Sequence, residues 1–447
     1  MKCFRTLNLR VLGLSAIALV MSCQPEKPAV ISPNLDLTDN GLIRNWYNLS
    51  LELGPKCNGY YEPVMARALS YFSILMHESL YRGIPDARSL KSSTDGFKFN
   101  LPEPDISTEY NWAIVANEAA MVYFENIFGS ATNFSQRTNK LYSDQLLKYS
   151  SGIDSAILAD SKFYGRQLVF ALLKYAEEDG FALAYLDPFY SAYQIPTGEG
   201  KWIPSTPDYT ARPLLPHWGN CKPVLRSNVE NIKLNKELTY SNQSKSIMYS
   251  EAVEVRNLGI AITETQKDDA SYFSRNMGYS SQPLYHVYSL ALQLMYQNQL
   301  DLPKSLDLMN KLSYALHDGY IASYKYIYSK NLLRASTYIK QLIDRYYQPE
   351  YPSMPLPEGL SDKSMCYAVG AEILSNYFGY RQSFTDNTQI ERPDLRNKSR
   401  SFDSFQQFSI EASEGEIYTG VHFRTSIEAG RKLGTDIARN TINFIQN

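Results

Sequence analysis

Three segments in the C-terminal third of the chain carry residue types that could hold or transfer an anionic group. Arg334 stands in the first, Ser361 and Lys363 stand in the second, and the third ends in Gly420-Val-His422. Arginine and lysine supply fixed positive charge, serine supplies a hydroxyl donor, and histidine can act as a nucleophile or an acid-base group. If these groups converge, they could bind a tetrahedral oxyanion away from water.

The third segment resembles the last motif of the bacterial vanadium-dependent haloperoxidases and of their relatives in the type 2 phosphatidic acid phosphatase superfamily. In that motif a Ser-Arg pair is followed, after three residues, by Gly-x-His. The resemblance implies that the histidine binds vanadate or becomes phosphorylated, while Ser and Arg hydrogen-bond the oxyanion. Gly420 and His422 match the motif, but Gly415 and Glu416 stand where Ser and Arg are expected.

The first motif of this family, a Lys followed after six residues by Arg-Pro, is also altered. Aligned on Arg334, the lysine position is Ile327 and the proline position is Ala335. Lys325 would point to another side of a helix. Lys330, four residues before Arg334, would share its face and is the one plausible substitute cation.

The second motif, Pro-Phe-Pro-Glu-Tyr-x-Ser-Gly-His-Ser in similar proteins, aligns without a gap to residues 355–364. Ser361 matches its serine, but its glycine has become Asp362 and its acid-base histidine has become Lys363. Arg334 and Lys363 against Asp362 and Glu416 give a pocket charge near zero, so an anion would gain little by entering.

Each retained residue also has a purely structural interpretation. His422 is then a buried histidine that hydrogen-bonds a neighbour, which we favour over a nucleophile because the Ser-Arg pair is missing. Arg334 is the counter-ion of Glu416 or Asp362, and Ser361 is a helix N-cap.

If the three motifs converge, the charged groups of Lys363 and Glu416 should lie close together. The former oxyanion pocket would then be neutralised internally by an ion pair or a small network, with His422 at its edge.

The resemblance extends from about residue 41 to the end of the chain, and it implies an all-α fold with one large helical-bundle domain of the haloperoxidase and acid phosphatase type, over residues 41–447. Other segments that carry the resemblance are Asn45-Trp46-Tyr47, Asn111-Trp112, Gly200-Lys-Trp202, Pro216-His-Trp218-Gly219-Asn220 and Asp318-Gly-Tyr-Ile-Ala-Ser-Tyr324.

Apolar periodicity independently favours helices. It predicts helices from Phe163 to Glu178, from Leu284 to Tyr296, from Ser305 to Tyr328, and after His422. Residues 187–226 contain seven prolines from Pro188 to Pro223, together with two tryptophans. We therefore expect an ordered excursion across the helices there, pinned by its aromatic side chains.

The N-terminus has the layout of a bacterial lipoprotein. Basic residues precede the apolar run of residues 11–20, and Met21-Ser22-Cys23 follows, so residues 1–22 are expected to be a signal peptide. Cys23 resembles the lipid-modified cysteine of a lipobox, and residues 23–40 would form the lipidated tether. The alternative is an ordinary signal peptide with an incidental cysteine. We expect attachment to a bacterial membrane, most simply the outer membrane, with the protein in the periplasm or at the surface.

Composition limits the partners. Removing residues 1–22 takes three of 44 basic residues and none of 46 acidic ones, which leaves 41 against 46 and a net charge of −5. This excludes a strongly basic nucleic-acid-binding surface. The most apolar later segment, Val64 to Leu80, contains charged residues and is expected to be a core helix. Cys57, Cys221 and Cys366 are expected to be free, buried thiols. No metal site is predicted.

Two functional classes remain open. In the first, the protein is a pseudoenzyme: a lipid-anchored envelope component that binds an unidentified protein partner or ligand and needs no cofactor. In the second, it is a haloperoxidase or acid phosphatase with a rearranged site built on His422, Arg334 and Lys330, and vanadate would be the cofactor of the haloperoxidase. A third interpretation, a helical, tyrosine-rich nutrient-binding lipoprotein, has less support because the order of the motifs follows the haloperoxidase-like family.

Overall fold

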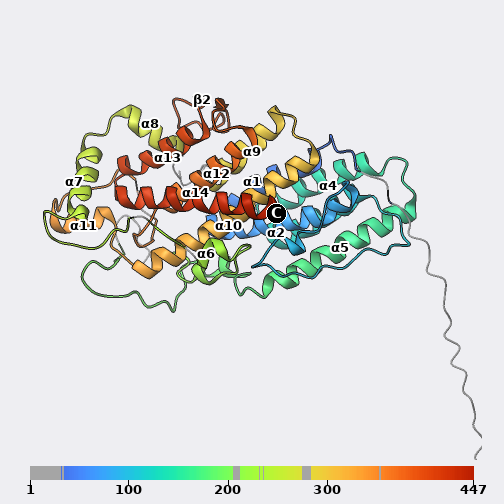
Figure 1. Cartoon of the computed structure of the whole chain (residues 1–447), viewed down its shortest axis with the longest axis horizontal. Helices are drawn as coiled ribbons and strands as arrows, with labels where there is room; N and C mark the ends of the chain where they lie inside the picture. The colour runs from blue at the N-terminus through green and yellow to red at the C-terminus, as the bar shows by residue number, and fades with distance from the viewer. Residues whose placement is uncertain are drawn as a thin grey trace, which may run out of the picture.

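The computed structural model describes residues 32, 35–204, 212–230, 232–234, 236–273, 283–351 and 354–446. The predicted signal peptide, Cys23 and most of the predicted tether lie outside these residues. The described chain is all-α, as predicted, apart from one pair of short antiparallel strands (Figure 1). The helices are α1 (Gly41–Leu53), α2 (Glu62–Leu80), α3 (Trp112–Phe128), α4 (Phe134–Ser150), α5 (Ser155–Glu177), α6 (Ser227–Glu230), α7 (Ile247–Ile260), α8 (Glu264–Phe273), α9 (Pro283–Gln297), α10 (Leu302–Lys330), α11 (Ala335–Leu342), α12 (Asp362–Phe378), α13 (Phe405–Tyr418) and α14 (Arg424–Gln446), and the strands are β1 (Phe384–Asp386) and β2 (Arg400–Phe402).

The long helix α10 runs through the core. Asp301 caps its start by accepting a hydrogen bond from the backbone N–H of Lys304, and Asn331 ends it in the left-handed conformation, with φ of 50°. Nearly every side of α10 is buried, because it packs against α2, α12 and α14. The helices predicted from Phe163, Leu284, Ser305 and beyond His422 are confirmed as parts of α5, α9, α10 and α14.

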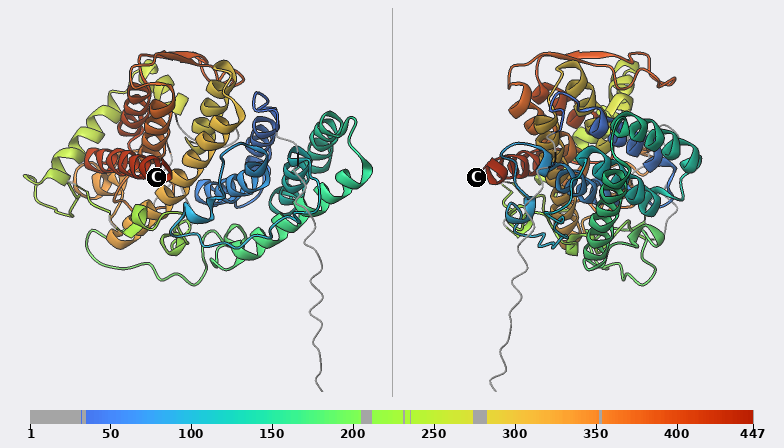
Figure 2. Two further views of the ribbon diagram at one scale, coloured as in Figure 1. Left: turned by 45° about the vertical axis from the view of Figure 1, so that its right-hand side comes forward. Right: turned by 90° about the vertical axis from the view of Figure 1, so that its right-hand side faces the viewer.

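Close packing of α14 against α12 places the segments that carry the motifs side by side. A Cβ on Gly430 would lie 2.1 Å from the carbonyl oxygen of Ser361, and one on Gly434 would lie 2.3 Å from that of Met365. Only glycine allows such an approach of the two backbones. Both views in Figure 2 keep the C-terminal helices together at one side of the bundle. The backbone N–H of Ser361 donates to the carbonyl of Ser426 at 2.9 Å, which places the start of α12 beside the start of α14.

The excursion predicted over residues 187–226 is irregular where the structure describes it, at 187–204 and 212–226. Its tryptophans are buried, Trp202 at 2% exposed and Trp218 at 0%, which confirms the aromatic anchoring. Asp318 on α10 accepts hydrogen bonds from the backbone N–H groups of Val224 and Leu225, at 2.7 and 2.9 Å. Burial raises the pKa of Asp318 to about 7.

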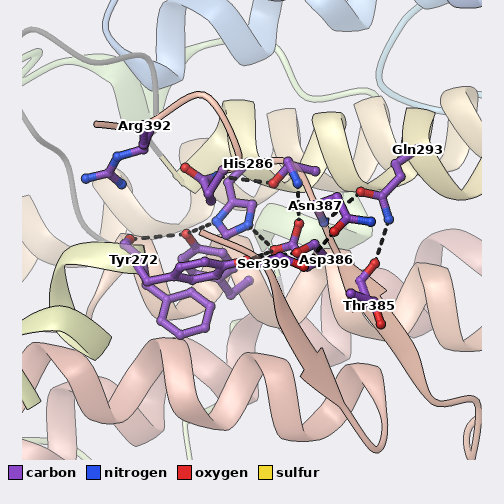
Figure 3. A network of polar contacts seen from close by, with 12 residues as sticks. Tyr272, His286, Gln293, Thr385, Asp386, Asn387, Arg392 and Ser399 are labelled. Carbon is purple, nitrogen blue, oxygen red and sulfur yellow. Dashed lines mark hydrogen bonds and ion pairs between the residues drawn. The ribbon is translucent and has the colours of Figure 1, made fainter. Parts of the chain in front are cut away.

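The buried side chain of His286 connects the strand pair to the helices (Figure 3). His286 on α9 places Nε2 2.7 Å from Oδ2 of Asp386 on β1, and Tyr272 on α8 donates its hydroxyl to the same oxygen at 2.8 Å. The other ring nitrogen lies 3.0 Å from the hydroxyl of Tyr367 on α12. Burial opposes ionisation of Asp386, but His286 outweighs it and lowers the pKa of Asp386 to about 2.

Three smaller predictions concern the remaining helices and cysteines. Val64 to Leu80 lies within the buried helix α2, as expected. Among the described helices, none has the length and apolar character needed to cross a membrane. Cys57, Cys221 and Cys366 are free and buried, which confirms the prediction for these thiols.

Candidate anion site

The structure brings Arg334, Ser361 and His422 together, although they come from three separate segments. Nη2 of Arg334 lies 3.2 Å from Nε2 of His422. Arg334 is 3% exposed, His422 5% and Ser361 0%, so the cluster lies almost wholly out of water. The convergence expected of these three residues is therefore present in the structure.

The carboxylate of Glu416 occupies the centre of this cluster. Glu416 lies in the last turn of α13, and its oxygens accept the hydroxyl of Ser361 at 2.7 and 2.8 Å and the hydroxyl of Ser364 at 2.6 Å. Ser361 is also the N-cap of α12, because its Oγ accepts the backbone N–H of Ser364 at 2.9 Å. The positive end of the α12 dipole therefore faces the Glu416 carboxylate, as it would face a bound oxyanion.

His422 is held between two acidic side chains and a cation. Its Nδ1 lies 2.9 Å from Oε1 of Glu358, and its Nε2 lies 3.5 Å from Oε2 of Glu416. A guanidinium can only donate, so the contact from Arg334 engages the lone pair of Nε2. In the neutral ring this places the proton on Nδ1, from where it is donated to Glu358. The nitrogen that would attack or ligate an oxyanion is thus already bonded.

Glu358 is a site residue that the sequence analysis did not single out. It is 0% exposed, and one of its oxygens lies 3.6 Å from Nη1 of Arg334. Burial opposes its ionisation, but His422 and Arg334 outweigh that effect and lower the pKa of Glu358. Its place three residues before Ser361, inside a matched motif, is a signal that could have identified it. Ser364, one turn into α12, was also missed.

The charges now oppose anion binding. The carboxylates of Glu358 and Glu416 face one guanidinium, that of Arg334, around a ring that donates its proton to Glu358. An incoming oxyanion would meet both carboxylates at short range in a region of low dielectric. Within the described ranges, no group of three His, Cys, Asp or Glu side chains is arranged to hold a metal ion.

Three predicted contacts are corrected by the structure. Arg334 pairs with Glu358, not with Glu416 or Asp362. In the part of the chain that the structure describes, Glu416 forms no ion pair with Lys363; it is satisfied instead by two hydroxyls. His422 does not lie at the edge of the network, because it contacts Arg334, Glu358 and Glu416. The reason is that Lys363 follows the N-cap on α12 and remains partly exposed, while Ser361 and Ser364 turn inward.

Lys330 does not reach the site. The expectation that it shares a helical face with Arg334 is wrong, because α10 ends at Lys330 and the chain turns at Asn331. Arg334 is the N-cap residue of the next helix, α11, and Lys330 pairs with Glu237 at 2.6 Å instead.

The remaining substituted positions are structural. Ile327 is 1% exposed in the apolar core. Gly415 lies inside α13, where a Cβ would be 3.4 Å from the Cα of Ala270. Asp362 is buried at the first position of α12, 6% exposed. Gly420 has a backbone role: its φ is 80°, in the left-handed region that favours glycine, and a Cβ at this position would lie 2.2 Å from the Tyr347 hydroxyl.

Comparison with known proteins identifies similar folds. A family model described as the VCPO second helical-bundle domain matches residues 307–447, which contain all three motif segments. A structure titled as the first bacterial vanadium-dependent iodoperoxidase superposes with a TM-score of 0.78 at 26% identity, covering 94% of this chain and 98% of that chain. No curated protein sequence matches significantly.

Two more distant structures share the fold. The holo-type structure of a bacterial vanadium-dependent chloroperoxidase gives a TM-score of 0.59 at 13% identity, covering 95% of this chain and 94% of that chain. An apo-type structure gives 0.62 at 13% identity, covering 94% and 96%. The chain therefore has the helical-bundle fold of the vanadium-dependent haloperoxidase family.

Proposed function

We propose that this protein is a non-catalytic relative of the bacterial vanadium-dependent haloperoxidases, anchored by lipid in the cell envelope and acting there as a binding or scaffold component. The observation that carries the proposal is the position of Glu416. Its carboxylate accepts the Ser361 and Ser364 hydroxyls at the start of α12, which are the donors that an oxyanion would need. The protein thus supplies its own anion at the site.

Vanadate does not fit the residues present. The guanidinium of Arg334 lies 3.2 Å from Nε2 of His422, and the Glu416 carboxylate lies 3.5 Å from the same nitrogen. Lys363 replaces the acid-base histidine that the resemblance implies, and Ile327 replaces the lysine. Loss of one oxyanion donor or of the acid-base group typically costs two to four orders of magnitude in rate, so their combined loss should abolish turnover.

The test of inactivity is direct. The purified protein, incubated with vanadate, peroxide and iodide or bromide, should oxidise no halide above the rate without protein. It should also cleave no p-nitrophenyl phosphate. His422→Ala is the matched control, and we expect it to give the same background as the wild type. Turnover by the wild type that disappears in His422→Ala would contradict the proposal.

The convergence of Arg334, Ser361 and His422 favours a second candidate, an oxyanion enzyme with a rearranged site around His422. For this candidate, Glu416 would have to leave the hydroxyls of Ser361 and Ser364 when substrate binds. The similarity to the iodoperoxidase structure makes halide oxidation the first reaction to assay. The same assays, with His422→Ala, decide between the two candidates.

The proposed anchor is tested separately. We expect Cys23→Ser to move the protein from the membrane fraction to the soluble fraction, because lipid chains on Cys23 would supply the attachment. Unchanged membrane association in this variant would show that a protein partner holds the chain instead. Crosslinking of the lipidated protein in its native envelope is the route to the partner, whose identity is open.

A further inference from the structure

The outer face of α5 exposes two phenylalanines and packs against no described element. This face, here called the α5 outer face, consists of exposed residues at helical spacing: Ala156, Ala159, Phe163, Gln167, Phe170, Lys174 and Glu177. Phe163 is 63% exposed and Phe170 is 58% exposed. They are seven residues apart, so they lie on the same side of the helix about two turns from each other.

Exposed apolar residues are common on protein surfaces and do not alone define a binding site. The second observation is where the chain enters the fold. Ser32 accepts a hydrogen bond from the backbone N–H of Tyr110 at 2.9 Å, and the Tyr110 ring packs on Tyr164 of α5, with centroids 5.4 Å apart. The N-terminal entry point therefore lies beside α5 at Tyr164, which is buried and follows Phe163 in the sequence.

The distance from the proposed anchor is short. Eight residues lie between Cys23 and Ser32, and the nine residue-to-residue steps reach at most about 30 Å. A lipid on Cys23 would therefore keep the bilayer within about that distance of α5. The helix α7 lies at the opposite end of the elongated bundle in Figure 1 and in the left view of Figure 2.

We infer that the α5 outer face rests on the lipid surface of the membrane, so that anchoring also orients the protein. This rests on the lipid anchor proposed above. Phenylalanine side chains insert readily at the boundary between headgroups and acyl chains, and exposed Lys174 can meet anionic headgroups. Arg166, at the margin of the face, pairs with Glu118 at 2.5 Å. Asp160 lies at the opposite margin, and Glu177 lies at the C-terminal end of the face. Tethering raises the effective concentration of lipid at this surface, so a small apolar patch is sufficient.

The test uses the mature, lipidated protein in vesicles of phosphatidylethanolamine and phosphatidylglycerol that contain a spin-labelled lipid. A bimane probe is attached at Gln167→Cys on the α5 outer face or, as the matched control, at Ile260→Cys on α7, where the native side chain is 62% exposed. The thiols of Cys57, Cys221 and Cys366 are buried and should not react. We expect quenching by the labelled lipid to be at least about threefold greater at 167 than at 260.

A further variant, Phe163→Ser with Phe170→Ser, should reduce quenching at 167 to the level at 260 while the protein still floats with the vesicles. Equal quenching at both probes, or no change in this variant, would overturn the inference and leave the anchor intact. Loss of flotation in the protein with native Phe163 and Phe170 would contradict the anchor itself. A probe at 167 that is shielded only when other envelope proteins are added would assign this face to a protein partner instead.

Discussion

Glu416 accounts for several substitutions at once. With its carboxylate bonded to Ser361 and Ser364, the site needs neither the lysine replaced by Ile327 nor the histidine replaced by Lys363. One cation, Arg334, remains because it pairs with Glu358. The retained residues are therefore explained by a structural network inside the protein, and they do not require a bound ligand.

The contribution of this carboxylate to stability can be measured. Glu416→Ala leaves the buried hydroxyls of Ser361 and Ser364 without their acceptor and should lower the free energy of unfolding by about 2 kcal/mol. Glu416→Gln keeps one acceptor oxygen and should cost less. Urea denaturation measures both. Glu414→Ala is the control, since Glu414 is on the same helix with its side chain 33% exposed, and it should cost under about 0.5 kcal/mol. Equal stability of the wild type and Glu416→Ala would show that the network is not needed.

At single residues the sequence predicts roles better than partners. The interpretations of Ser361 as an N-cap and of His422 as a buried, hydrogen-bonded histidine are confirmed. The pairing of Lys363 with Glu416 is wrong, because linear spacing does not say which side chains of a first helical turn point inward. The burial of Glu358 could not be predicted from the sequence, because a glutamate next to prolines is usually exposed.

Among the helices, the contact between α12 and α14 holds the site together. Gly430 lies where a methyl group would meet the Ser361 carbonyl at 2.1 Å. Alanine normally stabilises a helix interior relative to glycine, by about 1 kcal/mol. Here Gly430→Ala should instead destabilise the protein by at least about 2 kcal/mol, because α14 must move away from α12.

Thermal or urea unfolding would measure this effect. Lys432→Ala, at an exposed position of the same helix, is the control and should change stability by less than about 0.5 kcal/mol. If Gly430→Ala were as stable as the wild type or more stable, the close packing of α14 on the start of α12 would be contradicted.

The contact between His286 on α9 and Asp386 on β1 should make the stability of the protein depend on pH. The pKa of Asp386 is lowered from 3.8 to about 2 in the folded protein. Its ionised form therefore contributes stability that is fully present above pH 3.8 and is lost as the pH falls through about 2. Between pH 4.5 and pH 2 the wild type should lose about 2 kcal/mol more than Asp386→Asn does.

Urea unfolding across this pH range would measure the difference, with Asp436→Asn on α14 as the control for an acidic side chain that is 44% exposed. Parallel pH profiles for the wild type and Asp386→Asn would show that the contact with His286 does not hold the carboxylate in its ionised form.

Helices were predictable where apolar residues repeat at helical spacing, as in α5, α9, α10 and α14. Their ends were less predictable. The break between α10 and α11 carries neither proline nor glycine; Asn331 makes it by adopting a left-handed conformation, which asparagine tolerates but does not require. This turn ends α10 at Lys330, so Lys330 and Arg334 do not share a helical face and the proposed substitute cation does not reach the site.

For the whole molecule, the fold could be recognised from the sequence because the resemblance extends from about residue 41 to the end, with three motifs in the C-terminal third and apolar periodicity along several helices. The state of the site could not be recognised in the same way. It depends on whether the Glu416 carboxylate of α13 reaches the hydroxyls at the start of α12. The packing of helices that are distant in the sequence decides this, with α14 lying closely against α12. Substituted motif residues therefore indicate altered chemistry, and the structure shows which side chain contacts the hydroxyls of Ser361 and Ser364.

The most direct test of this account is vanadate binding, measured by isothermal titration calorimetry or ⁵¹V NMR on the purified wild-type protein, with His422→Ala as the control. Glu416 already occupies the donors, so we predict no saturable binding to the wild type, and a gain of anion binding in the double variant Gly415→Ser with Glu416→Arg, which restores the family's Ser-Arg pair. Saturable binding of one vanadate per wild-type protein, lost in His422→Ala, would contradict the account.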